Sequence, residues 1–307
     1  MFSNTIKGDY MTQRCLILAV SLLVLLSAGC FKVEETIKVN PDGTGTIERT
    51  IGISNNLIKM LEDLDKASGQ ESPSFDDKKY EDELKETGKK MAKQRGEGVE
   101  FKKVKKETKD NMRCFTLFFS FKDITKILPD VSELLEPPSV ISKQPGGKKR
   151  AGSKKRPIRF GFTKLPDGTA ELTLENPWGQ GLKDKIKEPI KTKAAKKTDK
   201  SGKPDQIDPD EKKIQDLIKE LCFSFNLVCG SQIIEAQATH RKNNRITLME
   251  IDYRKLSRDE KKFNQLMEEY PELPDDPAEA SKIIVKILGK SDGYKIELED
   301  TITIKFK

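Results

Sequence analysis

The chain is poor in the residues that most enzymes and metal sites rely on. Its 307 residues include one histidine, one tryptophan and few aromatic side chains. Metal sites usually need several His, Cys or carboxylate ligands, and Ser–His–Asp catalysis needs a histidine beside a nucleophile. We therefore interpret His240 as a surface residue at a strand end. Trp178 is interpreted as packing a loop onto the core; stacking on a sugar or insertion at a membrane interface are the alternatives.

Sequence motifs for catalysis or cofactors are also missing. The chain has no Gly-rich phosphate loop, no C-x-x-C pair and no H-E-x-x-H motif. We assign no catalytic residue, no metal ligand and no cofactor. Acidic residues are abundant, so hydrolysis by a carboxylate pair remains an alternative.

Cysteine is scarce as well. Apart from Cys15 and Cys30 in the N-terminal region, the chain has Cys114, Cys222 and Cys229, an odd number for disulfides. Cys222 and Cys229 lie on one expected strand, roughly 23 Å apart at ~3.3 Å per residue, which is too far for a bond. Cys114 could pair with either. The favoured interpretation is that all three are small buried apolar residues.

One long apolar run is present, at 15–26 near the N-terminus. At about 12 residues it is shorter than the ~20 that span a bilayer. Basic residues Lys7 and Arg14 precede it, and small residues come after it, which is the pattern of a signal peptide. Translation from Met1 or from Met11 fits this pattern. An ordinary signal peptide, with Cys30 beside its cleavage site by chance, is one interpretation of the segment.

The end of this segment, Leu26-Ser27-Ala28-Gly29-Cys30, favours a second interpretation because it resembles the bacterial lipobox. The resemblance implies cleavage between Gly29 and Cys30 and attachment of diacylglycerol to the Cys30 thiol, with palmitate as a suitable label. Two acyl chains anchor a protein stably without a membrane-spanning helix. Because Phe31 rather than Asp comes after Cys30, the outer membrane is slightly favoured over the inner one in a Gram-negative host.

Positive charge is concentrated in two segments. The formal net charge is +7, and segment 143–156 has seven basic residues and no acid. Segment 183–204 is also Lys-rich, and neither segment can bury enough apolar surface to offset chain entropy. We expect both to be disordered loops. The residues that could contact a polyanion, such as an acidic lipid or wall polymer, are Lys148, Lys149, Arg150, Lys154, Lys155 and Arg156. Nucleic acid is disfavoured as a partner because the expected compartment is the envelope.

Alternating apolar residues and turn signals predict most of the strands. A hairpin joins 33–39 to 44–53 through Pro41-Asp42-Gly43, and another joins 159–164 to 170–174 through a similar turn. The two turns could reflect a duplication, although this turn chemistry is common. Further strands are predicted at 99–106, 113–121, 223–228, 230–240 paired with 245–253, 283–288, 294–298 and 302–306.

Apolar residues at helical spacing predict the helices between these hairpins. They are expected after Ser54 or Asn55, at 80–94, after Asp123 with Ile127, around 214–221, and after Ser257. The prediction is an α+β fold in which antiparallel hairpins alternate with amphipathic helices and the Lys-rich loops interrupt them. The expected divisions are a signal peptide at 1–29, α+β regions at 30–142 and 211–307, a hairpin at 157–182, and loops at 143–156 and 183–210; alternatively, 157–307 and 30–142 form one domain.

The segment Asn40-Pro41-Asp42-Gly43-Thr44 resembles the D-x-D-G-T motif of haloacid-dehalogenase-type phosphatases. In that family the first Asp is the nucleophile. Asn40 occupies this position and cannot form an aspartyl-phosphate. We therefore interpret the segment as a hairpin turn.

Residues 30–45 resemble the mature start of LppM-type bacterial lipoproteins, in which a strand and an N-x-D-G-[ST]-G turn come after the lipidated cysteine. Residues 225–252 are faintly similar to strands of the same proteins. The resemblance implies an α+β lipoprotein with no assigned enzyme activity, and it transfers no site residue except Cys30. The leading hypothesis is a non-catalytic envelope lipoprotein with a binding or structural role and an unknown envelope partner. A carboxylate hydrolase and a polyanion binder are the alternatives.

Overall fold

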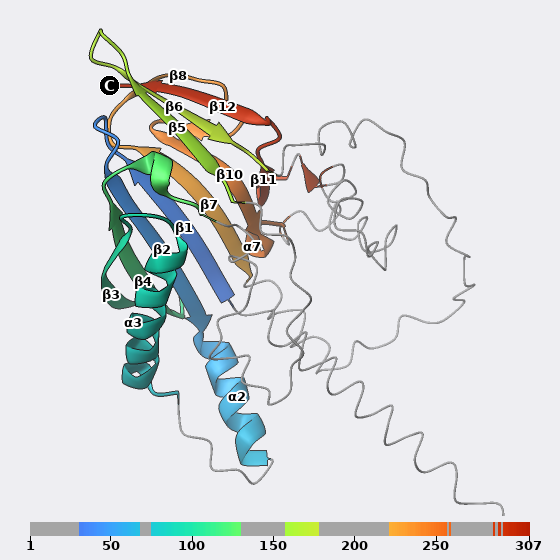
Figure 1. Ribbon diagram of the computed structural model, residues 1–307. Helices are drawn as coiled ribbons and strands as arrows, with labels where there is room; N and C mark the ends of the chain where they lie inside the picture. The colour runs from blue at the N-terminus through green and yellow to red at the C-terminus, as the bar shows by residue number, and fades with distance from the viewer. Residues whose placement is uncertain are drawn as a thin grey trace, which may run out of the picture.

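The computed structural model describes residues 31–67, 75–129, 157–177, 221–256, 258, 285, 288–289 and 291–307 (Figure 1). No helix in these ranges is long and apolar enough to cross a membrane. The elements are β1 (Phe31–Val39), β2 (Gly45–Ser54), α2 (Asn55–Ala67), α3 (Asp77–Gln94), β3 (Glu100–Lys109), β4 (Met112–Phe121), the 3-10 turn η1 (Ile124–Lys126), β5 (Arg159–Lys164), β6 (Ala170–Glu175), β7 (Cys222–Cys229), β8 (Ile233–Ala236), β9 (Arg241–Lys242), β10 (Arg245–Asp252), α7 (Tyr253–Leu256), β11 (Tyr294–Ile296) and β12 (Thr301–Phe306).

The strands form two sheets. The large sheet has eight strands in the order β11-β10-β7-β1-β2-β4-β3, with β9 beside β10, and the small sheet has the order β5-β6-β12-β8. β1 pairs antiparallel with β2 on one side and parallel with β7 on the other. The large sheet therefore contains strands from both halves of the chain.

The predicted alternation of hairpins and helices is wrong, because the described residues are mostly β-sheet. Helices α2 and α3 do occupy the first two predicted positions. After Asp123, the described residues up to 129 contain only the single turn η1, and Ile127 is already extended; the rest of this predicted helix lies outside the described residues. The expected helices at 214–221 and after Ser257 lie almost wholly outside the described residues.

Two strand predictions are also corrected. In the predicted strand 283–288, the described residues Val285 and Leu288 are helical, and the amide of Gly289 donates to the carbonyl of Val285 at 2.8 Å. A short apolar run has no periodicity that separates strand from buried helix. The segment 230–240 does not form one strand beside β10: β8 pairs with β12 in the small sheet, and β10 pairs instead with β7, β11 and the two-residue β9 at 241–242.

The two hairpin turns have the predicted conformation. In each, the Asp side chain accepts hydrogen bonds from the backbone amide and hydroxyl of the Thr two residues later, at 2.9 and 2.7 Å for Asp42 and 2.9 and 2.6 Å for Asp167. Gly43 and Gly168 have φ angles of 88° and 80°, which disfavour residues with a side chain. The segment at 40–44 is thus a hairpin turn.

One apolar core joins both sheets and α3. Large buried side chains come from the large sheet (Phe115, Phe119) and the small sheet (Phe306), and Leu84 of α3 belongs to the same core. Cys114, Cys222 and Cys229 are buried and unbonded, as the favoured interpretation predicted.

The core also contains a buried ion cluster. Both terminal nitrogens of Arg95 donate to the carboxylate oxygens of Glu35, at 2.7 and 2.5 Å, and an Arg49 nitrogen lies 3.6 Å from Glu35. Burial favours the neutral acid, but the charge and hydrogen bonds of Arg95, with the charge of Arg49, hold the pKa of Glu35 below its ordinary value. Glu35 is therefore an ionised group in the interior.

Candidate functional site

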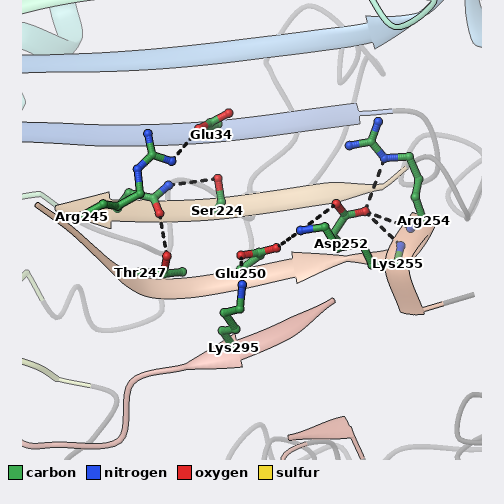
Figure 2. Close-up of polar contacts among 10 residues, drawn as sticks. Glu34, Ser224, Arg245, Thr247, Glu250, Asp252, Arg254, Lys255 and Lys295 are labelled. Carbon is green, nitrogen blue, oxygen red and sulfur yellow. Dashed lines mark hydrogen bonds and ion pairs between the residues drawn. The ribbon is translucent and has the colours of Figure 1, made fainter. Parts of the chain in front are cut away.

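The candidate site lies on the polar face of the large sheet, opposite the core. Side chains alternate along β1, so Lys32 and Glu34 project to this face, whereas Val33 and Glu35 point into the core. The register aligns Glu34, Ser224, Glu250 and Lys295 in one row across β1, β7, β10 and β11. Figure 2 shows these four side chains on their neighbouring strands.

A β-bulge in β10 determines which of its side chains face the site. Thr247 opposes Asn226 and Glu250 opposes Ser224, so three residues of β10 span two of β7. The extra residue, Leu248, is fully buried. Because the bulge shifts the alternation by one, Thr247 and Glu250 share the polar face, and bulges commonly re-aim side chains in this way.

These strands and the segment before β10 enclose a groove of about 580 Å³. Seven of its lining side chains are cationic and three are acidic, which gives a net charge of +4 with histidine neutral. The cations are Lys32, Arg241, Lys242, Arg245, Arg254, Lys255 and Lys295, the acids are Glu34, Glu250 and Asp252, and the remaining residues are Cys222, Ser224, Asn226, Thr239, His240 and Thr247.

Close ion pairs fill one end of the groove. Glu250 accepts a hydrogen bond from Lys295 at 2.9 Å and another from Lys255. Partial burial raises the pKa of Glu250, but the two lysines outweigh it and the net shift is downward. Asp252 accepts from the backbone amide of Arg254 at 3.0 Å and so caps α7. We call this part the carboxylate end.

The other end, formed by the hairpin of β9 and β10, has an excess of cations. Lys242 and Arg245 oppose each other directly in the register. Arg245 has one distant acidic neighbour, Glu34 at 3.9 Å, and no carboxylate among the described residues pairs with Arg241 or Lys242. The Arg241 guanidinium instead donates to the carbonyl of Ile233 at 2.7 Å. We call this part the hairpin end.

A buried carboxylate supports the segment that borders the hairpin end. Glu297 is fully buried and accepts hydrogen bonds from the Thr239 amide at 2.6 Å and the Thr239 hydroxyl at 3.1 Å. The backbone amide of Thr247 donates to the carbonyl of His240 at 2.9 Å. These bonds hold Thr239 and His240 in fixed positions beside the groove.

Most of the residues singled out from the sequence fall outside the part of the chain that the structure describes. Gly29, Cys30, Trp178 and the six basic residues of segment 148–156 are outside the described residues. His240 is partly exposed and lines the groove. No group of three or more His, Cys, Asp or Glu residues in the described ranges could hold a metal ion.

No family model and no curated protein matches the chain. Among solved structures, the chain is similar to the NMR structure of the folded domain of LppM from Mycobacterium tuberculosis, with 8% identity, a TM-score of 0.25, and coverage of 72% of this chain and 81% of that one. A TM-score this low supports no inference about fold or function.

Proposed function

We propose that the protein is a lipid-anchored extracytoplasmic protein with a non-catalytic binding role, and that the groove binds an anionic ligand. The observation that carries this proposal is the ratio of seven cationic to three acidic side chains around one groove. A concave site lined by one sign of charge concentrates ligands of the opposite sign. The volume of about 580 Å³ is in the range of small-ligand sites.

The state of Glu250 supports binding rather than hydrolysis. A general acid that works near neutral pH needs a raised pKa, whereas the two lysines lower that of Glu250. An ionised carboxylate between two lysines orders those cations. It is also available as an acceptor for hydroxyl groups of a ligand.

Attachment to the cell envelope would restrict the classes of partner that the protein can meet. A lipid on Cys30 would confine the domain to the envelope, where acidic polymers and acidic lipids are the abundant polyanions. We infer a partner from this class, and nucleic acid is disfavoured for the same reason. Membrane attachment rests on the Cys30 motif, with the outer membrane slightly favoured in a Gram-negative host.

Lysine footprinting tests the groove. The mature chain is acetylated with and without inorganic polyphosphate, and the bound-to-free ratio is measured for each lysine by mass spectrometry. We expect protection of Lys32, Lys242, Lys255 and Lys295, and no protection of the exposed Lys109, Lys122 and Lys164. A ratio is needed because the hydrogen bond to Glu250 raises the pKa of Lys255 and slows its reaction.

Two results would contradict the groove as the site. Protection confined to Lys148, Lys149, Lys154 and Lys155 would instead identify the basic segment as the polyanion contact. Uniform protection of all lysines would indicate nonspecific charge attraction.

Palmitate labelling with membrane fractionation tests the anchor separately. We expect wild type to be labelled and membrane-bound, and Cys30→Ala to lose both properties. An unlabelled, soluble wild type would show that the protein is secreted without a lipid.

A further inference from the structure

The hairpin end of the groove has an unfavourable arrangement of charge. Lys242 and Arg245 flank a two-residue turn and oppose each other across β9 and β10. Directly opposed residues have Cβ atoms about 5 Å apart, and like charges in these positions destabilise a sheet. Such local conflicts are typical of functional positions.

Among the described residues, one long ion pair of Arg245 is all that offsets this repulsion. Lys242 has no ion pair in the described part of the chain, and the nearest carboxylate to Arg245 is Glu34, 3.9 Å away. The carboxylate end differs, because each acid there contacts at least two cationic side chains. The net positive charge of the groove is therefore concentrated beside the hairpin.

Neutral hydrogen-bonding groups adjoin the two cations. Thr247 and Asn226 oppose each other in the next row of the groove. The Thr247 hydroxyl donates to the Asn226 amide oxygen at 3.1 Å, and the Asn226 amide nitrogen donates one hydrogen to the Ser224 hydroxyl at 3.4 Å. Asn226 is 3% exposed although it lines the groove. The second N–H of the Asn226 amide is left to donate. Two cations beside this N–H suit a group with three acceptor oxygens and up to two charges, which describes phosphate better than carboxylate.

We propose that the hairpin end is a phosphoryl subsite and that the ligand is a phosphate ester of a polyhydroxylated molecule. Lys242 and Arg245 hold the phosphate, and the hydroxyls of the ligand lie along Ser224 and Glu250 toward the carboxylate end. This inference rests on the proposed function and narrows its ligand from any anion to a phosphorylated polyol. A free polymer and a lipid headgroup could both supply this chemistry.

Calorimetry on the full mature chain in non-ionic detergent tests the subsite. The probes are sn-glycerol 3-phosphate, inorganic phosphate and glycerol. We expect glycerol 3-phosphate to bind more tightly than inorganic phosphate and glycerol not to bind. The double variant Lys242→Gln/Arg245→Gln should weaken glycerol 3-phosphate at least tenfold, whereas Lys109→Gln/Lys122→Gln, which removes the same charge from exposed positions outside the groove, should leave it unchanged.

Arg245→Lys keeps the charge but loses the planar, two-pronged donor geometry, so an intermediate loss is expected. This variant also keeps the test informative if the double variant fails to fold. Equal binding by wild type and both groove variants would overturn the subsite. If lysine footprinting still showed protection of the groove, the proposed function would survive that failure.

The source of the phosphate is distinguished in a second measurement. Nanodiscs containing phosphatidylglycerol replace the soluble probe, with phosphatidylcholine nanodiscs as the reference. Binding of the protein to phosphatidylglycerol nanodiscs that requires Lys242 and Arg245 supports the subsite with a lipid as the source of the phosphate. Binding of the soluble ester but not of these nanodiscs supports the subsite with a free phosphate ester as the source. If neither binding of the soluble ester nor binding to nanodiscs depended on Lys242 or Arg245, the inference would be overturned.

Discussion

Glu34 and Glu35 are neighbours on β1 but occupy opposite environments. Glu35 is 2% exposed and is held by Arg95 at 2.5–2.7 Å. Glu34 is partly exposed and contacts Lys32 at 2.9 Å and Arg245 at 3.9 Å. The two-residue period of a strand alone separates them. The same residue type therefore stabilises the core on one face of the sheet and pairs with cations that line the groove on the other.

The largest expected difference is in stability. Breaking a buried ion pair by removing one partner costs about 3–5 kcal/mol, whereas exposed pairs contribute about 0–1 kcal/mol. We expect Glu35→Gln to lower the free energy of unfolding by the first amount and Glu34→Gln by the second. Urea unfolding followed by circular dichroism measures both. Equal losses would show that β1 does not separate a structural face from a functional one.

A smaller effect is the loss of the Glu35 contribution to stability as the pH is lowered. The folded-state pKa of Glu35 lies below its ordinary value of 4.5, so its contribution is fully present above pH 4.5 and is lost as the pH falls through the folded pKa. The stability difference between wild type and Glu35→Gln should thus be constant from pH 7 to about 5 and shrink below 4.5. Glu250→Gln should behave in the same direction, because the pKa of Glu250 is also lowered, but with a smaller amplitude since Glu250 keeps some contact with solvent, whereas Glu35 is 2% exposed. A difference that grew in acid would contradict the ionised state of Glu35.

The smallest expected effect is a gain in stability rather than a loss. Relief of the repulsion between Lys242 and Arg245 should make Lys242→Gln more stable than wild type by roughly 0.2–1 kcal/mol without ligand. Removing a functional conflict commonly stabilises a protein at the expense of its activity. Thermal unfolding at low salt measures the gain, and 0.5 M NaCl should reduce it. Lys109→Gln serves as the control, and a destabilised Lys242→Gln would show that the two cations do not repel.

The sequence predicted local structure better than architecture. Turn residues such as Asp42-Gly43 and Asp167-Gly168 predict hairpins because the conformation depends on neighbours in the chain. The pairing of β1 with β7 does not depend on neighbours in the chain, since Lys32 lies opposite Cys222, 190 positions further on. The helical state of Val285 depends on tertiary packing in the same way.

The groove was not predicted because five strands, a loop and α7 contribute to it, and no motif spacing connects them. A signal was nevertheless present in Ser224 and Asn226, two polar residues that alternate with Phe225 and Leu227 in an otherwise apolar strand. One face of such a strand does not belong to the apolar core. The bulge at Leu248 has no comparable signal, and without it the side of β10 on which Glu250 lies would be assigned wrongly.

The parallel pairing of β1 with β7 also has a consequence for the order of folding during synthesis. β1 is made before the other described strands, and β2 can cover one of its edges almost at once. Its other edge stays open until Cys229 has left the ribosome, because β7 is the neighbour that closes it. An open strand edge invites pairing with other chains. The nascent protein therefore carries an unpaired strand edge, which is prone to pairing with other chains, until β7 has been made.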